Sequence, residues 1–200
     1  MVKSIIAGII GGIIAFVWGF VSWMVLPWHN EVINKFQNQE FVSWVIKENV
    51  TKDGVYMAPY AQGDQFHVTP DDISSEMKQQ DAALKKGPYV FAQVRVNGVD
   101  MSSPLPYIYS FLTQFVAIFF VSFIMLKMID TTYGGRLFFV TMIGLLAGII
   151  ALVPNWNWFG AGYRFTLVMM ADYVVQWFFV GLFLAGFARP KPERGHELMM

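Results

Sequence analysis

Four long apolar stretches constrain the fold of this chain more than any other feature of its sequence. They cover residues 5–26, 107–128, 137–153 and 165–187. A bilayer core about 30 Å thick is crossed by roughly 20 consecutive apolar residues of α-helix. Soluble domains carry roughly 25% charged residues, whereas this chain carries 14%. Each stretch therefore predicts a transmembrane helix.

The segment between the first two stretches has a different composition. Ten of the 14 acidic residues and seven of the 14 basic residues lie between Glu31 and Asp100. The predicted fold class is an α-helical membrane protein with four transmembrane helices and a small α+β extracytoplasmic domain inserted between helices 1 and 2. Its predicted parts are transmembrane helix 1 (1–28), the extracytoplasmic domain (29–106), transmembrane helices 2 to 4 (107–188) and a cytoplasmic tail (189–200).

The basic residues predict the orientation, because Lys and Arg are more frequent near the cytoplasmic ends of membrane spans. Six of them fall on one predicted side: Lys3, Lys127, Arg136, Arg189, Lys191 and Arg194. The short loop on the opposite side contributes Arg164 alone. We therefore expect both termini in the cytoplasm and residues 29–106 outside it. The first stretch is longer than the apolar core of a signal peptide and lacks a small-residue cleavage site, so we expect it to remain as an anchor.

Four elements are predicted inside the extracytoplasmic domain. Apolar residues at a helical period favour an amphipathic helix over 31–49 that continues from the first span. Residues 54–60 form a strand candidate, and residues 89–96 alternate in polarity before the turn dipeptide at 97–98. Between them, Thr69 and Pro70 are typical of a helix start, and Gly87-Pro88 of a stop. The domain is therefore expected to be α+β, and to gain stability from the membrane helices or another subunit.

Several classes of site are excluded or disfavoured. The chain has no cysteine, which rules out disulfides, thiolate metal sites, iron-sulfur clusters and thiol catalysis. The three histidines lack paired spacing, so we predict no metal site and no cofactor. Residues 29–106 carry seven positive against ten negative charges, which gives no basic footprint for nucleic acid. No catalytic signature is present, so no catalytic residue is assigned.

Small residues recur along one face of two predicted spans. In the first span they are Gly8, Gly12, Ala15, Gly19 and Ser22, and in the third they are Thr141, Gly144, Gly148 and Ala151. Small side chains let helix backbones approach closely. This packing stabilises helix association in lipid, where no hydrophobic effect drives the helices together. These faces therefore predict helix packing, either within one chain or between copies in a homo-oligomer.

Asp172 is the leading candidate for a functional site. It lies about seven residues into the fourth span, roughly 10 Å deep at 1.5 Å per residue. A carboxylate inside a membrane costs several kcal/mol unless it is paired or protonated. The candidate ligand-binding residues at a similar depth are Asp172, Gln176, Gln114, Thr113, Ser110, Ser22, Trp23 and His29, with Trp28 beside them. They form either a polar pocket in the outer leaflet or a structural hydrogen-bond network between helices.

Four segments carry a resemblance to a known group of proteins. They are residues 17–29, 54–59 and 87–91, and Asp172 together with Gly181-Leu182. Over most of its length the chain resembles a family of small bacterial four-helix inner-membrane proteins with no established activity. The resemblance implies a bacterial inner membrane and transfers no site residue.

Three functions remain open from the sequence. The first is a binding or accessory subunit whose partners are the lipid bilayer, further copies or partner membrane subunits, and the missing catalytic motifs favour it. The second is a small-solute or proton-coupled carrier that uses Asp172, Gln176 and Gln114. The third is a membrane-embedded enzyme acting through His29 and Asp172.

Overall fold

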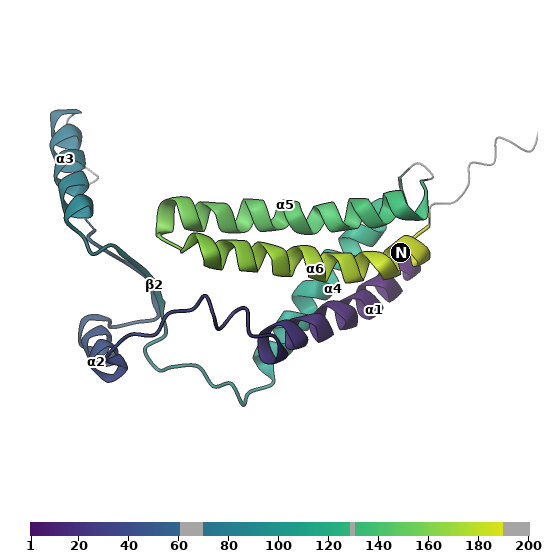
Figure 1. The fold of residues 1–200 in the computed structure, drawn as a ribbon, viewed down its shortest axis with the longest axis horizontal. Coiled ribbons are helices and arrows are strands. Elements are labelled where there is room, and N and C mark those ends of the chain that lie inside the picture. The colour runs from purple at the N-terminus through teal and green to yellow at the C-terminus, as the bar shows by residue number, and fades with distance from the viewer. Residues whose placement is uncertain (61–69, 129–130, 190–200) are drawn as a thin grey trace, which may run out of the picture. The chain divides into compact units, whose positions relative to one another are not determined.

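The computed structural model describes residues 1–60, 70–128 and 131–189. Its elements are α1 (Val2–Phe20), the π-helical turn η1 (Val21–Val25), α2 (Gln39–Asn49), β1 (Gly54–Ala58), α3 (Pro70–Lys86), β2 (Val90–Val94), α4 (Leu105–Met125), α5 (Tyr133–Phe159) and α6 (Tyr163–Phe187), as Figure 1 shows. Among these described residues, four helices are long and apolar enough to cross a membrane: Val2–Val25, Leu105–Met125, Tyr133–Phe159 and Tyr163–Phe187. The prediction of four such helices is therefore confirmed.

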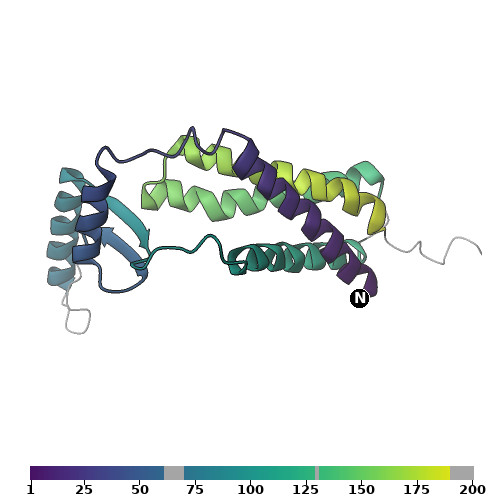
Figure 2. The same ribbon diagram turned by 90° about the horizontal axis from the view of Figure 1, so that it is seen from below.

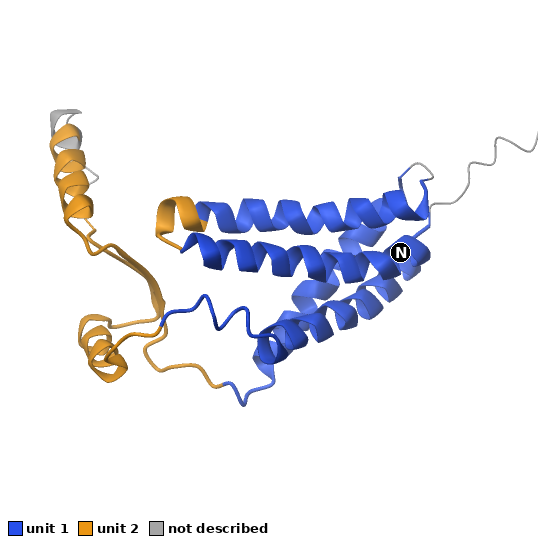
Figure 3. Ribbon diagram, viewed as in Figure 1, with its two compact units in different colours: residues 1–34, 101–154, 162–200 blue, residues 35–100, 155–161 orange. Residues whose placement is uncertain are grey.

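The chain divides into two compact units (Figure 3). The first unit takes residues 1–34, 101–154 and 162–200, and the second takes residues 35–100 and 155–161. The first unit therefore holds α1, α4, α6 and most of α5. The second unit holds α2, α3 and both strands, together with the last residues of α5.

Glycines on α1 let this helix approach α4 closely, and in Figure 2 the two ribbons come together towards the N-terminal end of α1. A Cβ atom added to Gly8 would meet the ring of Phe115 at 2.9 Å, and one added to Gly11 would meet Ile118 Cγ2 at 2.7 Å. Gly12 faces Phe111 in the same way. Gly8 and Gly12 of the predicted small-residue face thus pack against α4 within the chain, and Gly11 adds to this contact.

A second glycine contact joins α5 to α6, which run as an antiparallel hairpin (Figure 2). A Cβ atom on Gly144 would lie 2.6 Å from Trp177 Cβ, and one on Gly148 would lie 3.4 Å from Met170 Cγ. In the same way, Gly181 of α6 leaves room for the side chains of Leu137 and Val140 on α5. The buried apolar core of the first unit includes Ile118, Val121, Met125, Val140, Trp177, Val180 and Leu184.

Arg136 lies in the first turn of α5 and is only 6% exposed. Its Nε donates to Ala185 O at 2.8 Å, and its Nη1 donates to Thr131 O. The carbonyls in the last turn of a helix lack partners along the helix, and a basic side chain is a favourable donor to them. Arg136 thereby ties the start of α5 to the end of α6.

The α5 helix extends further than the sequence predicted. The predicted span ended at residue 153 before Pro154, whereas α5 continues through Pro154 to Phe159. Pro154 removes one helical hydrogen bond and its ring crowds the carbonyl four residues earlier, yet the helix continues to Phe159. The helix ends instead at Gly160, whose φ of +75° is a left-handed conformation that glycine adopts readily.

The second unit contains a two-stranded antiparallel sheet. Strands β1 and β2 pair with Tyr56 opposite Ala92, and helix α3 separates them in sequence. Asp53 Oδ1 accepts a hydrogen bond from Val96 N at 2.9 Å, which ties the two strand ends together. Helix α3 begins at Pro70 and is followed by Gly87 at a φ of +62°. Thr69, the predicted cap of this helix, lies outside the described residues.

The helix predicted over 31–49 is wrong for its first part. The chain leaves the helical conformation at Leu26, which has φ −83° and ψ 139°. Pro27 follows, and a proline disfavours a helical conformation of the residue before it. Helix α2 begins only at Gln39, where the Asn38 side chain accepts from Phe41 N at 2.9 Å.

Candidate functional site

The end of the first span turns His29 back onto Ser22. In η1 the N–H of Leu26 bonds to Val21 O at 3.0 Å, which is a π-helical bond over five residues. Such turns are frequent at functional sites because they shift the register of the side chains. Ser22 is fully buried and His29 is 1% exposed, and Ser22 Oγ lies 2.9 Å from His29 Nε2.

Asp172 of α6 reaches the same point. Its Oδ1 accepts from Trp18 Nε1 at 2.6 Å and from Ser22 Oγ at 2.8 Å. Its Oδ2 lies 3.4 Å from His29 Nε2. The side chain of Asp172 is 14% exposed, so this carboxyl is largely withdrawn from solvent but held by three neighbours.

The hydrogen-bond partners of Ser22 indicate which ring nitrogen of His29 carries a hydrogen. The Ser22 hydroxyl has a single hydrogen, and it is donated to Asp172. Ser22 must therefore act as the acceptor towards His29 Nε2 and towards Trp28 Nε1, which lies at 3.1 Å. With Asp172 ionised, this arrangement requires a hydrogen on His29 Nε2, which both the Nε2–H tautomer and the imidazolium provide. Its other ring nitrogen, Nδ1, has no hydrogen-bond partner among the residues that the structure describes.

Tryptophan rings enclose this polar cluster. The ring of Trp23 stacks on His29 with centroids 3.9 Å apart and planes 4° apart. Trp28 meets the same imidazole edge-on at 5.4 Å, and Trp18 meets Trp28 edge-on at 6.2 Å. These apolar surfaces exclude water, so the interaction of the carboxyl with its donors is stronger than it would be in bulk solvent.

The cluster contains a serine, a histidine and an aspartate, yet its geometry differs from that of a hydrolytic triad. In such a triad the serine and the acid bond to opposite nitrogens of the imidazole. Here Ser22 and Asp172 both approach Nε2. The Ser22 hydroxyl also donates to the carboxylate rather than to the imidazole. The arrangement therefore does not activate Ser22 as a nucleophile.

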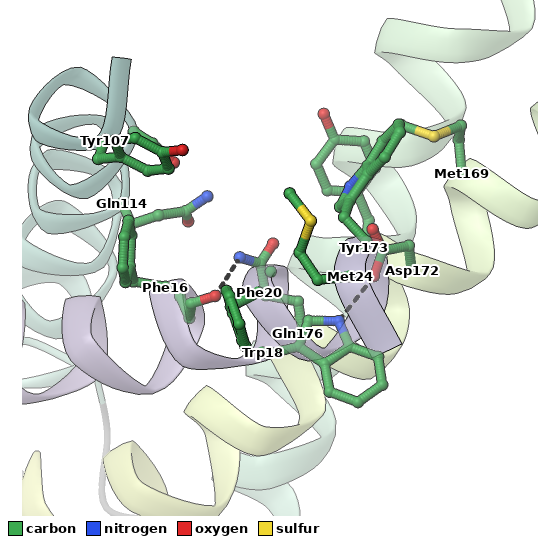
Figure 4. A pocket seen from close by; sticks show the side chains of 14 residues that line it. Phe16, Trp18, Phe20, Met24, Tyr107, Gln114, Met169, Asp172, Tyr173 and Gln176 are labelled. Carbon is green, nitrogen blue, oxygen red and sulfur yellow. Dashed lines mark hydrogen bonds between the residues drawn. The ribbon is translucent and has the colours of Figure 1, made fainter. Parts of the chain in front are cut away.

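A pocket of about 300 Å³ lies beside the carboxyl, between α1, η1, α4 and α6 (Figure 4). Fourteen residues line it: Ala15, Phe16, Trp18, Gly19, Phe20, Trp23, Met24, Tyr107, Ser110, Gln114, Met169, Asp172, Tyr173 and Gln176. Figure 4 shows Gln114 and Asp172 on opposite sides of this space. Ligand sites in proteins span roughly 300–1,000 Å³, so the pocket matches a small organic molecule.

Gln176 has its amide fixed inside the pocket wall. Its Nε2 donates to Ala15 O at 3.2 Å, and the residue is only 8% exposed. Since the Ala15 carbonyl oxygen can only accept a hydrogen bond, the Gln176 atom that bonds to it is the nitrogen. The amide oxygen of Gln176 then remains as an acceptor. Ala15 itself is 1% exposed, so this bond also satisfies a carbonyl that faces away from solvent.

The structure brings most of the predicted site residues together. Five of them line the pocket: Asp172, Gln176, Gln114, Ser110 and Trp23. Ser22 and His29 contact the Asp172 carboxyl without lining the pocket. Thr113 is outside the lining, and its hydroxyl donates to Tyr109 O of its own helix at 2.8 Å. His67 and His196 lie outside the described residues.

Trp18 is the contact that sequence reasoning missed. It donates the shortest hydrogen bond that Asp172 receives, at 2.6 Å. Its one signal in the sequence is its position four residues before Ser22, one helical turn away on the same face. Over the described part of the chain, no group of three His, Asp or Glu side chains is placed to bind a metal ion.

Comparisons of the chain with models of known families, with curated proteins and with solved structures give no match. Any functional assignment therefore depends on the site itself.

Proposed function

We propose that this chain is a multi-pass protein of the bacterial inner membrane that binds a small organic solute in the pocket beside Asp172. The observation that carries the proposal is a carboxyl that lines a pocket among helices long and apolar enough to cross a membrane. Ionisable residues inside membrane spans are rare because they are costly, and they mark solute and ion pathways. The donors from Trp18 and Ser22 stabilise such a residue while the pocket stays open on its other side.

The proposed orientation places the pocket on the outer side of the membrane. The basic residues near the span ends favour cytoplasmic termini and an extracytoplasmic segment over 29–106. Asp172 belongs to the N-terminal half of α6, and Ser22 belongs to the last turn of the first span. Both positions are then closer to the outer surface than to the cytoplasm. A solute arriving from outside would meet this pocket first, as a carrier requires.

An accessory role is the second candidate, and the surface of α2 favours it. Phe41 and Trp44 are each 58% exposed, and their rings stack at 5.9 Å. Helix α2 has no buried residue. An aromatic pair of this kind is typical of surfaces that contact a partner protein or the lipid headgroups.

Filling the pocket tests the solute-binding function. Gly19 lines the pocket, and a Cβ atom added to it would meet nothing within 4 Å. Gly19→Leu is therefore expected to occupy the pocket without displacing its walls. Native mass spectrometry of protein extracted from its own membranes should show a bound small molecule on the wild type and none on Gly19→Leu.

Gly134→Leu is the matched control for this experiment. Gly134 is also a helical glycine with nothing within 4 Å of an added Cβ atom, and it lies outside the pocket. It should retain the small molecule. Equal spectra for the wild type and Gly19→Leu would contradict the proposal, and a stoichiometric partner protein in both would favour the accessory role.

A further inference from the structure

The chemistry of the pocket wall specifies a class of solute. We infer that the pocket binds an organic cation, an ammonium group on a small apolar body, with Asp172 as its counter-ion. This inference rests on the proposed function, because it names the solute of the same pocket. Its basis is the charge, the unused acceptors and the aromatic rings of the lining.

The pocket lining, as far as the structure describes it, contains an acidic residue and no basic residue. Of the lining residues that the structure describes, Asp172 alone carries a formal charge, and none is Lys, Arg or His. The nearest imidazole, His29, uses its Nε2 hydrogen on Ser22. The phenols of Tyr107 and Tyr173 also belong to the lining. His29 lies 3.4 Å from the carboxyl but outside the lining. A buried carboxylate is costly, and a cationic solute inside the pocket offsets that cost.

The unused hydrogen-bonding capacity beside the carboxyl consists of acceptors, whereas Gln114 on the opposite side of the pocket offers both a donor and an acceptor. An ionised carboxylate accepts about four hydrogen bonds. Asp172 Oδ1 already receives two, from Trp18 and Ser22, whereas among the described residues the one polar contact of Oδ2 is with His29, at 3.4 Å. The fixed amide of Gln176 adds its oxygen as a further acceptor. An ammonium group supplies donors for these atoms, and an anion would meet like charge.

Aromatic rings form much of the remaining wall. Six of the fourteen lining residues are aromatic: Phe16, Trp18, Phe20, Trp23, Tyr107 and Tyr173. The face of an aromatic ring attracts a cation, and desolvated sites show the strongest effect. The same rings bury the apolar body of a solute. A carboxylate set among aromatic rings therefore favours a cation over a neutral molecule of the same shape.

Three probes with the same apolar body separate charge from shape. They are 2-phenylethylamine, which is a cation near pH 7, neutral 2-phenylethanol and anionic phenylacetate. Binding is measured by titration calorimetry on the full chain in lipid nanodiscs, with empty nanodiscs subtracted. The amine should bind at least tenfold more tightly than either of the other probes. Asp172→Asn keeps the shape of the side chain and should remove this preference, and Gly19→Leu should abolish binding of the amine.

Each other outcome overturns a stated claim. If phenylethanol or phenylacetate binds as tightly as the amine, and Gly19→Leu abolishes that binding, the cation inference is wrong and solute binding stands. If no probe binds to the folded wild type, both claims are wrong. The comparison of probes on the unaltered chain decides the inference even if Asp172→Asn does not fold.

Discussion

At the scale of single residues, the sequence was sufficient to predict Asp172 as a candidate site residue but not Trp18. A carboxylate in an apolar stretch stands out because its burial is costly. A tryptophan in the same stretch looks like any other lipid-facing side chain. Its function as a donor depends on the packing of α1 against α6, and no local pattern in the sequence encodes that contact.

Removing the indole donor should destabilise the bundle. Trp18→Phe keeps an aromatic ring beside Phe179 but deletes the hydrogen bond to Asp172. Hydrogen bonds to charged groups contribute about 1.5–3 kcal/mol, so the free energy of unfolding should fall by that order. Thermal unfolding in detergent measures the loss. Trp156→Phe, at a residue that is 51% exposed, is the control, and equal melting temperatures for the two variants would refute the structural importance of this bond.

At the scale of elements, the small-residue faces were predictable and their partners were not. The spacing of Gly8 and Gly12 predicted a packing face, and the structure adds that α4 covers it. Gly19 continues the same pattern in the sequence, yet nothing lies within 4 Å of an added Cβ atom there. The pattern records only the size of the side chain. It does not distinguish a glycine that makes room for a helix from one that makes room for a pocket.

The contact between α5 and α6 predicts a large effect of one substitution. Gly144→Leu would place a Cβ atom 2.6 Å from Trp177 Cβ and 2.8 Å from Tyr173 O, so the helices must separate. Overpacking typically costs about 1–3 kcal/mol, and occasionally more. A melting curve in detergent should show Gly144→Leu well below the wild type. Gly134→Leu on the same helix should melt close to the wild type, and equal destabilisation by both would argue against this packing.

The limits of α5 illustrate where local sequence signals mislead. Pro154 and the polar residues after it resemble a loop, because proline usually interrupts a helix. The helix nevertheless reaches Phe159, and the residues after it turn where Gly160 takes a left-handed conformation. Conversely, the amphipathic pattern from residue 31 suggested a helix that the chain forms only after Asn38. The residue next to the helix, Gly160 after α5 and Asn38 before α2, determined each boundary more than hydrophobic periodicity did.

At the scale of the whole molecule, hydropathy alone located the four long helices, because each is longer and more apolar than a soluble helix. Charge density also predicted a separate domain over residues 29–106, whereas the second compact unit takes residues 35–100 together with 155–161. The sequence could not supply the pairing of β1 with β2, since 31 residues separate Ala58 from Val90. Such contacts over a long separation leave no local periodicity to read.

The proposed orientation predicts a labelling pattern. The chain has no cysteine, so single-cysteine variants report one position each. Ser43→Cys lies in the predicted extracytoplasmic segment, and Gly134→Cys lies on the predicted cytoplasmic side; both positions are exposed. A membrane-impermeant maleimide should label Ser43→Cys in intact spheroplasts and Gly134→Cys only after lysis. The opposite pattern would invert the topology and turn the Asp172 pocket towards the cytoplasm.

The most direct test of the solute-binding pocket is a crystal structure of the protein grown from a lipidic mesophase after extraction from its own membranes. We expect density for a small molecule between Gln114 and Asp172, within hydrogen-bond distance of Asp172 Oδ2. A closed bundle, in which the side chains of Gln114 and Asp172 bond directly to each other and leave no space, would show that these residues only tie the helices together. That result would contradict the proposed function.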